Sequence, residues 1–461
     1  MSTSPPTLAI TFKNNSNVAA SAVYVGFVSG SSGAPVAIAN AGDDSPVLAV
    51  GDVASYPAQG NWYTLDALPS GVNVTSFSGR VYVCYETPWA VQYAGYEPAQ
   101  AVTDPNFYLR YDKMEMTFTG QPSDVANLTS IDYWSIPLTL KTLEAGTVVQ
   151  TVSGLLADAS PPVTTQAVFD ALNPLTTPPV SGVPGPGGTD GTPLPALVPG
   201  QFEQYGSGPA PGKTFARIIG PSSYPPVYPP PGAIPVTPYD LLQDYLTYLL
   251  DTYGPGTTGG GSPPALGAGV IAFISGEFAG VGPNVPPTGP QSQQSYDLTA
   301  TIDADLNITL TGTTSGMGAT VMVYKKDDLL NPTGIYGGNA PYYLNGSTTP
   351  TSPGNDVYGW VGGDLFSGLN IGAVGSAAVV GGQVVGDMPS QSWFQLPASS
   401  FFGNLQTGGP FYNRWAATLS TLSQAYNFAY TDRFAPVFVS LNPAKADTLQ
   451  IVLEDAAVNM G

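Results

Sequence analysis

The sequence predicts a mainly β protein that consists of a β-sandwich or barrel lobe and a second lobe of mixed α/β structure. The first 160 residues contain short runs in which apolar and polar side chains alternate, separated by turn-forming residues. The 55 glycines and 47 prolines favour turns and short strands over long helices. At 461 residues the chain exceeds one ordinary domain, and its clearest helical pattern lies in the second half.

Residues 1–160 form the predicted β-rich lobe. Because apolar and polar residues alternate with period two, we expect strands over residues 8–12, 22–28, 62–65, 79–85 and 147–152. The single cysteine, Cys84, falls in one of these strands and is expected to be a small buried hydrophobic residue.

The segment 108–140 contains the strongest candidates for chemistry. Alternation over residues 113–119 directs Met114, Met116 and Phe118 to one face of a strand. Lys113, Glu115 and Thr117 point to the opposite, polar face. After a loop rich in turn residues, the apolar run 131–138 contains one acid, Asp132.

Glu115 and Asp132 are therefore candidate catalytic carboxylates. They lie on what the pattern predicts to be two sequential strands, and sequential strands usually lie side by side. Two carboxyl groups facing one groove are what glycosidic bond cleavage needs: one protonates the leaving oxygen, and the other attacks the sugar or activates water. The alternative is that Glu115 is a solvated strand residue and that Asp132 caps a turn.

The same segment resembles the catalytic region of glycoside hydrolase family 64, the endo-β-1,3-glucanases related to thaumatin-like proteins. A strand glutamate is followed there by an N-x-T-x-x-D loop and an aromatic residue before an I-P-L strand. The positions that match in this chain are Asn127, Thr129, Asp132, Ile136, Pro137 and Leu138. A second similarity covers residues 426–432, where Tyr426, Phe428, Tyr430 and Asp432 match and Asn427, Ala429 and Thr431 depart from the family pattern.

The resemblance implies a thaumatin-like β-sandwich or barrel lobe and a mixed α/β lobe with a wide cleft between them. It also implies that Glu115 is the general acid and Asp132 the general base of an inverting hydrolysis of β-1,3-glucan of the laminarin type. The departure at Thr431 removes one acid of the family pattern.

Further residues are candidates for substrate binding. Polar side chains near the two acids are suited to orienting the acid, the water or the glucan hydroxyls: Thr117, Asn127 and Thr129. Aromatic side chains are candidate platforms for sugar rings or, alternatively, core residues: Tyr111, Tyr133, Trp134 and Trp360. Tyr430 and Asp432 are candidate cleft residues, and Asp432 could equally be a structural hydrogen-bond acceptor.

The remaining chain divides by composition. Residues 161–235 form a Pro/Gly-rich insertion with a connecting strand, 236–430 the mixed α/β lobe, and 431–461 C-terminal strands that return to the β lobe. Helices are expected over residues 166–172, 237–250, 361–371 and 413–425. The second has a capping threonine, Thr237, and an apolar stripe, and the fourth has apolar residues on one side. Strands are expected over residues 270–273, 295–310, 320–324 and 449–453.

The composition excludes several classes of function. A net charge of −20 disfavours nucleic acid and anionic membranes as partners, whereas a neutral polysaccharide is not repelled. The chain has no histidine, which excludes Ser-His-Asp and Cys-His catalysis. We expect no cofactor and no metal, because Asp303 and Asp305 lack the surroundings of a calcium loop.

The family resemblance implies an extracellular protein, although the N-terminal residues show no signal-peptide pattern. We expect a monomer. A non-catalytic glucan-binding or structural relative is the main alternative, and a surface-layer protein is a weaker one because no repeat of fixed period is present.

Overall fold

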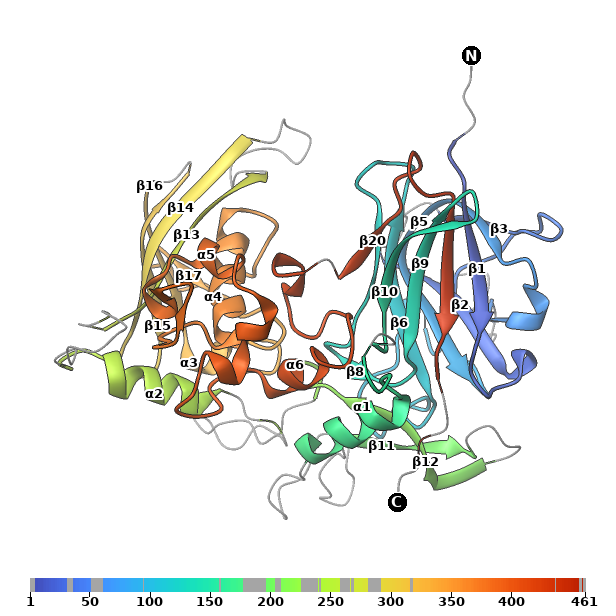
Figure 1. Cartoon of the computed structure of the whole chain (residues 1–461), viewed down its shortest axis with the longest axis horizontal. Helices are drawn as coiled ribbons and strands as arrows, with labels where there is room; N and C mark the ends of the chain where they lie inside the picture. Colours follow the sequence, from blue (N-terminus) through green and yellow to red (C-terminus); the bar gives the residue numbers. More distant parts are fainter. Residues whose placement is uncertain are drawn as a thin grey trace. The chain divides into compact units, whose positions relative to one another are not determined.

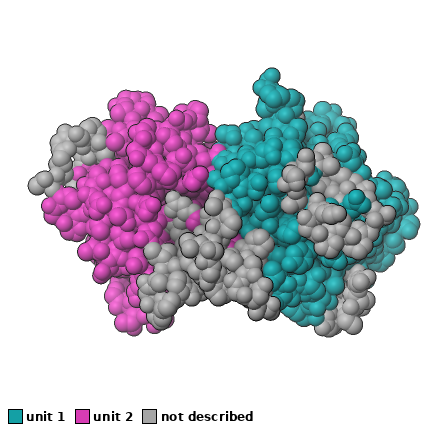
Figure 2. Space-filling model, turned by 90° about the horizontal axis from the view of Figure 1, so that it is seen from below, with its two compact units in different colours: residues 1–220, 418–427, 436–461 teal, residues 221–417, 428–435 magenta. Residues whose placement is uncertain are grey.

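The structure is a computed structural model that describes residues 5–30, 36–50, 61–93, 95–156, 159–176, 196–203, 209–224, 239, 242–257, 266, 269–280, 292–315, 318–435, 437–455 and 458. The chain divides into two compact units (Figure 2). Unit 1 comprises residues 1–220, 418–427 and 436–461, and unit 2 comprises residues 221–417 and 428–435. The boundaries that the sequence predicts at 160, 235 and 430 stay a prediction.

Unit 1 is built on an 11-stranded sheet (Figure 1). Its main path runs β10-β9-β21-β1-β5-β6-β7-β20, and β2, β3 and β4 branch from it through β5 and β2. The strands are β1 (Leu8–Asn14), β2 (Val23–Ser29), β3 (Ala37–Asn40), β4 (Tyr63–Thr64), β5 (Val72–Tyr85), β6 (Tyr111–Phe118), β7 (Val125–Leu128), β9 (Leu138–Glu144), β10 (Thr147–Ser153), β20 (Phe438–Ser440) and β21 (Thr448–Leu453).

The sheet of unit 1 comes close to closing into a barrel. The C-terminal strand β21 pairs parallel to the N-terminal strand β1, which draws the end of the chain into the β lobe. The two end strands of the path are joined by the backbone N–H of Ser440, which donates to Oε1 of Gln150 at 2.7 Å. The apolar faces enclose one core, and Cys84 is fully buried in an adjoining aromatic cluster, as the sequence predicts. The mainly β fold class is confirmed.

A smaller sheet and one helix complete unit 1. The three-stranded sheet has the order β11 (Leu197–Phe202), β12 (Pro209–Ile219) and β8 (Tyr133–Trp134). Helix α1 (Thr165–Leu172) begins where the side chain of Thr164 accepts from the N–H of Ala167. The short 3-10 turns are η1 (Ala20–Ala22), η2 (Leu65–Ala67) and η3 (Asn173–Thr176).

Unit 2 contains a five-stranded antiparallel sheet packed against helices (Figure 1). Its strands in order are β13 (Val270–Gly280), β14 (Ser292–Ile302), β15 (Ile308–Thr314), β16 (Gly318–Tyr324) and β17 (Tyr343–Leu344), and β18 (Val379–Val380) pairs with β19 (Gln383–Val384). The helices are α2 (Gln243–Tyr253), α3 (Lys326–Leu329), α4 (Val357–Ile371), α5 (Ser390–Trp393) and α6 (Arg414–Leu419). The 3-10 turns are η4 (Val385–Asp387), η5 (Ala398–Ser400), η6 (Phe402–Asn404) and η7 (Thr431–Arg433).

Helix α4 is the central helix of unit 2. It is buried almost all round, so it lacks a polar face that would mark its start in the sequence. Asp356 caps it by accepting from the N–H groups of Tyr358 and Gly359, and Gly372 ends it in the left-handed region at φ 85°. The helix therefore begins four residues before the predicted range of 361–371.

Two other predicted helices differ from the structure. Helix α2 begins at Gln243 rather than at 237, and the predicted capping residues 237, 238 and 240 lie outside the described residues. The predicted helix over 413–425 is wrong beyond Leu419, because the following segment pairs with strands of unit 1 instead. There Gln424 N donates to the carbonyl of Ser153 at 2.9 Å. No helix in the described part of the chain is long and apolar enough to cross a membrane.

Candidate active site

Strand β6 carries the first candidate acid on its polar face. Met114, Met116 and Phe118 point into the core of unit 1, and the alternate residues Lys113, Glu115 and Thr117 point away from it, as the sequence predicts. β6 lies between β5 and β7, so its polar face is continued by side chains from both neighbours.

Three polar side chains form a row across these strands. Arg80 of β5 and Asn127 of β7 are the direct cross-strand partners of Glu115. The next pair along the strands is Ser78 and Thr117, whose hydroxyl oxygens lie 2.9 Å apart. These side chains line a groove of about 560 Å³ within unit 1, and its full lining is Val28, Ser29, Gly30, Ser78, Gly79, Arg80, Gly95, Glu97, Glu115, Met116, Thr117, Val125 and Asn127.

Glu115 shares a cation with a second carboxylate. Nε of Arg80 donates to Oε1 of Glu115 at 3.0 Å, and Nη1 of the same guanidinium lies 2.5 Å from Oε1 of Glu97. The hydroxyl of Tyr82 donates to the other oxygen of Glu97, also at 2.5 Å. The side chains that form these ion pairs are about one-third exposed to solvent: the exposed fraction is 37% for Arg80, 34% for Glu97 and 39% for Glu115. Glu115 is therefore open to the groove.

Asp132 lies in the turn before β8, not on a strand paired with β6. The sequence-based prediction of a continuous strand over 131–138 is wrong, because β8 is only two residues long and pairs with β12. The break is set by Asp112, whose Oδ2 accepts from the backbone N–H groups of Ser135 at 3.0 Å and Ile136 at 2.9 Å. Burial raises the pKa of Asp112 to about 7, although these two donors, the N–H of Lys113 and the charge of Lys113 act to lower it.

Lys113 links Asp132 to the face of β6 that carries Glu115. Its Nζ forms an ion pair with Oδ2 of Asp132 and lies 5.3 Å from the ring centroid of Tyr133. The Lys113 side chain is only 5% exposed, whereas that of Asp132 is 37% exposed. Since Lys113 and Glu115 are two residues apart on one strand, Asp132 is held beside a side chain that shares the face of Glu115.

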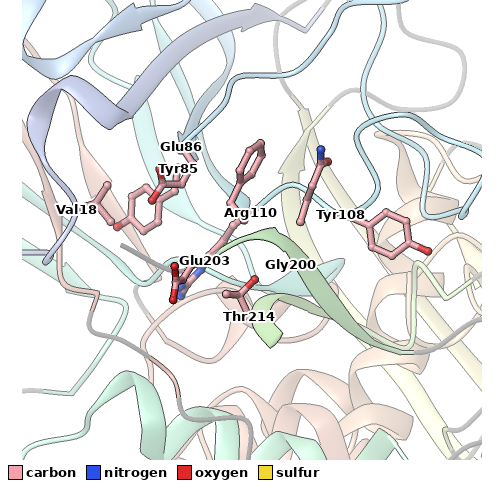
Figure 3. A pocket seen from close by; sticks show the side chains of 10 residues that line it. Val18, Tyr85, Glu86, Tyr108, Arg110, Gly200, Glu203 and Thr214 are labelled. Atoms are coloured by element: carbon pink, nitrogen blue, oxygen red, sulfur yellow. The ribbon is translucent and has the colours of Figure 1, made fainter. Parts of the chain in front are cut away.

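A second cavity in unit 1 is far smaller (Figure 3). Its volume is about 20 Å³, which is enough for about one water and too little for a sugar ring. Figure 3 shows side chains of Val18, Tyr85, Arg110 and Thr214 around it. Neither predicted catalytic acid lines this cavity, whereas Glu115, but not Asp132, lines the larger groove, which remains the candidate site.

The comparisons with known proteins bear on this unit. A family model described as β-1,3-glucanase, that of glycoside hydrolase family 64, matches residues 6–204. The matched residues include the segment 108–140 that carries the resemblance. This match confirms the resemblance predicted from the sequence and identifies the chain as a glycoside hydrolase of the β-1,3-glucanase type. Comparison with curated protein sequences finds no match.

Two solved structures are similar over nearly the whole chain. A laminaripentaose-producing β-1,3-glucanase in complex with laminaritetraose is 17% identical, with a TM-score of 0.50 over 98% of this chain and 99% of that one. A family 64 β-1,3-glucanase domain from Clostridium beijerinckii is 13% identical, with a TM-score of 0.47 over 98% of this chain and 100% of that one. The first similarity shows that the fold of a β-1,3-glucanase extends beyond residues 6–204.

The polar candidates of the family 64 segment fall in two places. Thr117 and Asn127 line the groove with Glu115. Thr129 is half-buried and lies beyond the end of β7, where it forms a bridge with Tyr426. It lines a separate cavity of about 20 Å³ with Lys113.

The aromatic candidates of the family 64 segment are buried. Tyr111, Tyr133 and Trp134 are 1%, 4% and 2% exposed. Tyr111 packs edge-on against Tyr133, and the buried guanidinium of Arg217 lies 4.6 Å from the ring centroid of Tyr111. Because their rings are covered, the prediction that these three residues are sugar platforms is wrong, and the alternative that they are core residues holds.

The other candidates lie in unit 2. Trp360 stacks on Phe278 with the ring centroids 4.4 Å apart, and the guanidinium of Arg433 lies 4.6 Å from its ring centroid. The hydroxyl of Tyr430 donates to the carbonyl of Gly338 at 3.1 Å. Asp432 is exposed on η7. The roles of Trp360, Tyr430 and Asp432 in substrate binding stay predictions.

Sequence reasoning missed three residues of the site. The alternation of β6 predicts the direction of Lys113 but not its pairing with Asp132. Arg80 lies in a predicted strand, yet its partner Glu97 lies in a loop that follows no periodic pattern. In the described part of the chain, no three Cys, Asp or Glu side chains are grouped to hold a metal ion.

Proposed function

We propose that the chain is an endo-acting β-1,3-glucan hydrolase that inverts the anomeric centre, with Glu115 as general acid and Asp132 as general base. The observation that carries this proposal is the placement of Glu115 in a polar groove of about 560 Å³, with Lys113 holding Asp132 beside the same strand face. The family match over residues 6–204 supports β-1,3-glucan as the substrate.

The proposal of inversion over retention rests on the resemblance of residues 108–140 to the catalytic segment of family 64. Lys113, which binds Asp132, lies two residues from Glu115 on β6, so both acids are associated with one face of that strand. An inverting pair needs roughly 6.5–9.5 Å to leave room for a water, whereas a retaining pair needs about 5 Å.

Each side chain then has a defined role. Glu115 gives its proton to the leaving glycosidic oxygen while that oxygen's bond to the anomeric carbon breaks. Asp132 takes a proton from a water whose oxygen forms the new bond to that carbon. Lys113 keeps Asp132 ionised and oriented, because an adjacent positive charge favours the carboxylate form. Thr117 and Asn127 are suited to binding glucan hydroxyls, because both line the groove.

The test is laminarin hydrolysis by the full chain and by the Glu115→Gln and Asp132→Asn variants. We expect each variant to lose at least about 100-fold in kcat/KM, as is typical when a positioned acid or base is removed. NMR of the first product should show the α-anomer, and early products should include long oligosaccharides. Glu144→Gln is the matched control, because Glu144 is an exposed acid at the end of β9. Retained activity in Glu115→Gln, or a first-formed β-anomer, would contradict the proposal.

One observation favours a non-catalytic glucan-binding protein as the second candidate. Arg80 donates to Glu115, and a cation beside a carboxylate opposes the protonated form that a general acid needs. This candidate predicts that the native protein and Glu115→Gln both bind laminarin without releasing reducing sugar. Binding is measured by calorimetry on the same preparations.

We also propose that the protein acts outside the cell, because family 64 enzymes are typically extracellular. Fractionation of the producing cells tests this location, and detection of the chain only inside them would contradict it.

A further inference from the structure

Around Glu115, carboxylate groups outnumber positively charged groups. Among the described residues, the groove is lined by one cation, Arg80, and two carboxylates, Glu97 and Glu115. A second cation and a third carboxylate, Lys113 and Asp132, do not line the groove and form an ion pair with each other. One guanidinium therefore remains for two carboxylates. The titratable and charged groups around Glu115 come from several elements. Arg80 and Tyr82 lie on β5, and Lys113 lies with Glu115 on β6. Glu97 is in the loop before β6, Asp132 is in the turn before β8, and β7 contributes the neutral Asn127.

Glu97 receives the stronger set of hydrogen bonds. It accepts from Arg80 and from the hydroxyl of Tyr82, both at 2.5 Å. Glu115 accepts from Arg80 at 3.0 Å, and this is its one hydrogen-bond donor in the described part of the chain. Hydrogen bonds to a carboxylate favour its ionised form, so the negative charge is favoured on Glu97.

Tyr82 remains a donor over the working pH range. Its side chain is buried among aromatic rings, with Trp89 at 4.3 Å between centroids. This burial, followed by the charge of Glu97, raises the pKa of Tyr82 well above its usual value. The hydroxyl therefore keeps its proton, and Glu97 keeps two donors.

We propose that Glu97 is a positioning residue that balances the charge of Arg80, so that Glu115 retains the proton it delivers to the leaving oxygen. The arrangement resolves the conflict between an adjacent guanidinium and a general acid, because the positive charge is already neutralised by Glu97. The inference rests on the proposed function of Glu115.

The proposal predicts opposite effects for the two members of the pair. In Glu97→Gln the charge of Arg80 acts on Glu115 alone, so Glu115 ionises at lower pH. In Arg80→Gln the cation is lost, so Glu115 holds its proton to higher pH. The groups are about one-third exposed, so solvent screening limits the interaction, and each shift should be about half to one pH unit.

The experiment measures kcat/KM for laminarin from pH 4 to 9 with the full chain. For Glu97→Gln we expect the midpoint of the high-pH limb to fall by about half to one unit. Activity above that midpoint then decreases about 3- to 10-fold and activity at low pH is unchanged. For Arg80→Gln the midpoint should rise. Glu97→Asp preserves the charge and should restore the native profile, and Glu144→Gln, on a strand four places from β6 along the sheet, should match the native protein.

Several outcomes overturn the proposal. The proposal is wrong if the midpoint of the high-pH limb is unshifted in both Glu97→Gln and Arg80→Gln. It is also wrong if these variants lose kcat/KM equally at all pH values without a shift of the midpoint, because that result indicates a purely structural role. Should Glu97→Gln fail to fold, as judged from its Tm, a midpoint in Arg80→Gln that does not rise is decisive. These results are distinct from failure of the proposed function, in which Glu115→Gln retains the native activity.

Discussion

The Lys113–Asp132 pair should respond very differently to the loss of either partner. Lys113 is 5% exposed, so its charge depends on Asp132, whereas Asp132 is 37% exposed and can be solvated by water. Removing one partner of a fully buried pair costs about 3–5 kcal/mol. Because Asp132 is at the edge and Lys113 also lies near the ring of Tyr133 and the carboxyl of Asp112, we expect Asp132→Asn to cost less, about 1–3 kcal/mol.

The reciprocal change should be nearly neutral for stability. Lys113→Met preserves most of the side-chain volume and leaves only a partly hydrated carboxylate, so we expect a loss below about 1 kcal/mol. The double variant should recover most of the stability lost in Asp132→Asn, because it no longer contains a buried cation without a partner.

The assay is thermal and urea unfolding of the full chain, followed by circular dichroism at neutral pH. A loss of 2 kcal/mol corresponds to a decrease of Tm of about 4–8 °C for a unit of this size. Glu144→Gln is the control for loss of one exposed acid. Equal destabilisation by the two single variants, or strict additivity in the double variant, would refute the reasoning.

Three further predictions concern buried carboxyl groups. The pKa of Asp112 is raised to about 7 by burial, so the stability that its protonated carboxyl contributes is complete below about pH 4 and is lost as the pH rises through 7. Over this range the free energy of unfolding should fall by up to about 4 kcal/mol more in the native protein than in Asp112→Asn. Parallel plots of the free energy of unfolding against pH for the two proteins would contradict this. Asp455→Asn should destabilise unit 1 by about 3 kcal/mol in urea unfolding, because Arg110 and Asp455 form an ion pair in which both side chains are buried. Asp447→Asn, at an exposed position, is the control, and equal destabilisation by the two variants would contradict the prediction. Asp364→Asn should destabilise unit 2 by about 2–4 kcal/mol, because the buried carboxylate of Asp364 binds Arg433, Tyr296 and Ser390. Asp305→Asn, at an exposed position, is the control. An unchanged unfolding midpoint in Asp364→Asn would contradict a stabilising role for this carboxylate.

The parts of the fold that follow from local patterns are predictable from the sequence. Alternation identifies β6 and the direction of Glu115, because a strand buried on one face needs an apolar residue at every second position. Helix α1 is predicted to within one residue, because it has a capping threonine and an apolar stripe. The start of α4 is missed because that helix has no polar face.

The turn that carries Asp132 depends on a distant residue. The backbone N–H groups of Ser135 and Ile136 bind the carboxylate of Asp112, more than twenty positions earlier in the chain. Local propensity therefore predicts one continuous strand, whereas the long-range hydrogen bonds impose a break. The same aromatic side chains that suggest a sugar-binding surface pack around this break, and for Tyr133 and Trp134 burial is the result.

The scarcity of cations explains why the pairing at the site could not be predicted. The chain has 12 Lys and Arg residues and 32 Asp and Glu residues, so each cation has many possible partners in the sequence. In the described residues, four cations form the ion pairs, and two of them, Arg80 and Lys113, contact the two candidate catalytic acids. Their partners are selected by strand register for Arg80 and by the Asp112-bound turn for Lys113. Because an unequal sharing of charge can assign different protonation states to two acids, these two cations are the part of the site on which the proposed division between acid and base depends.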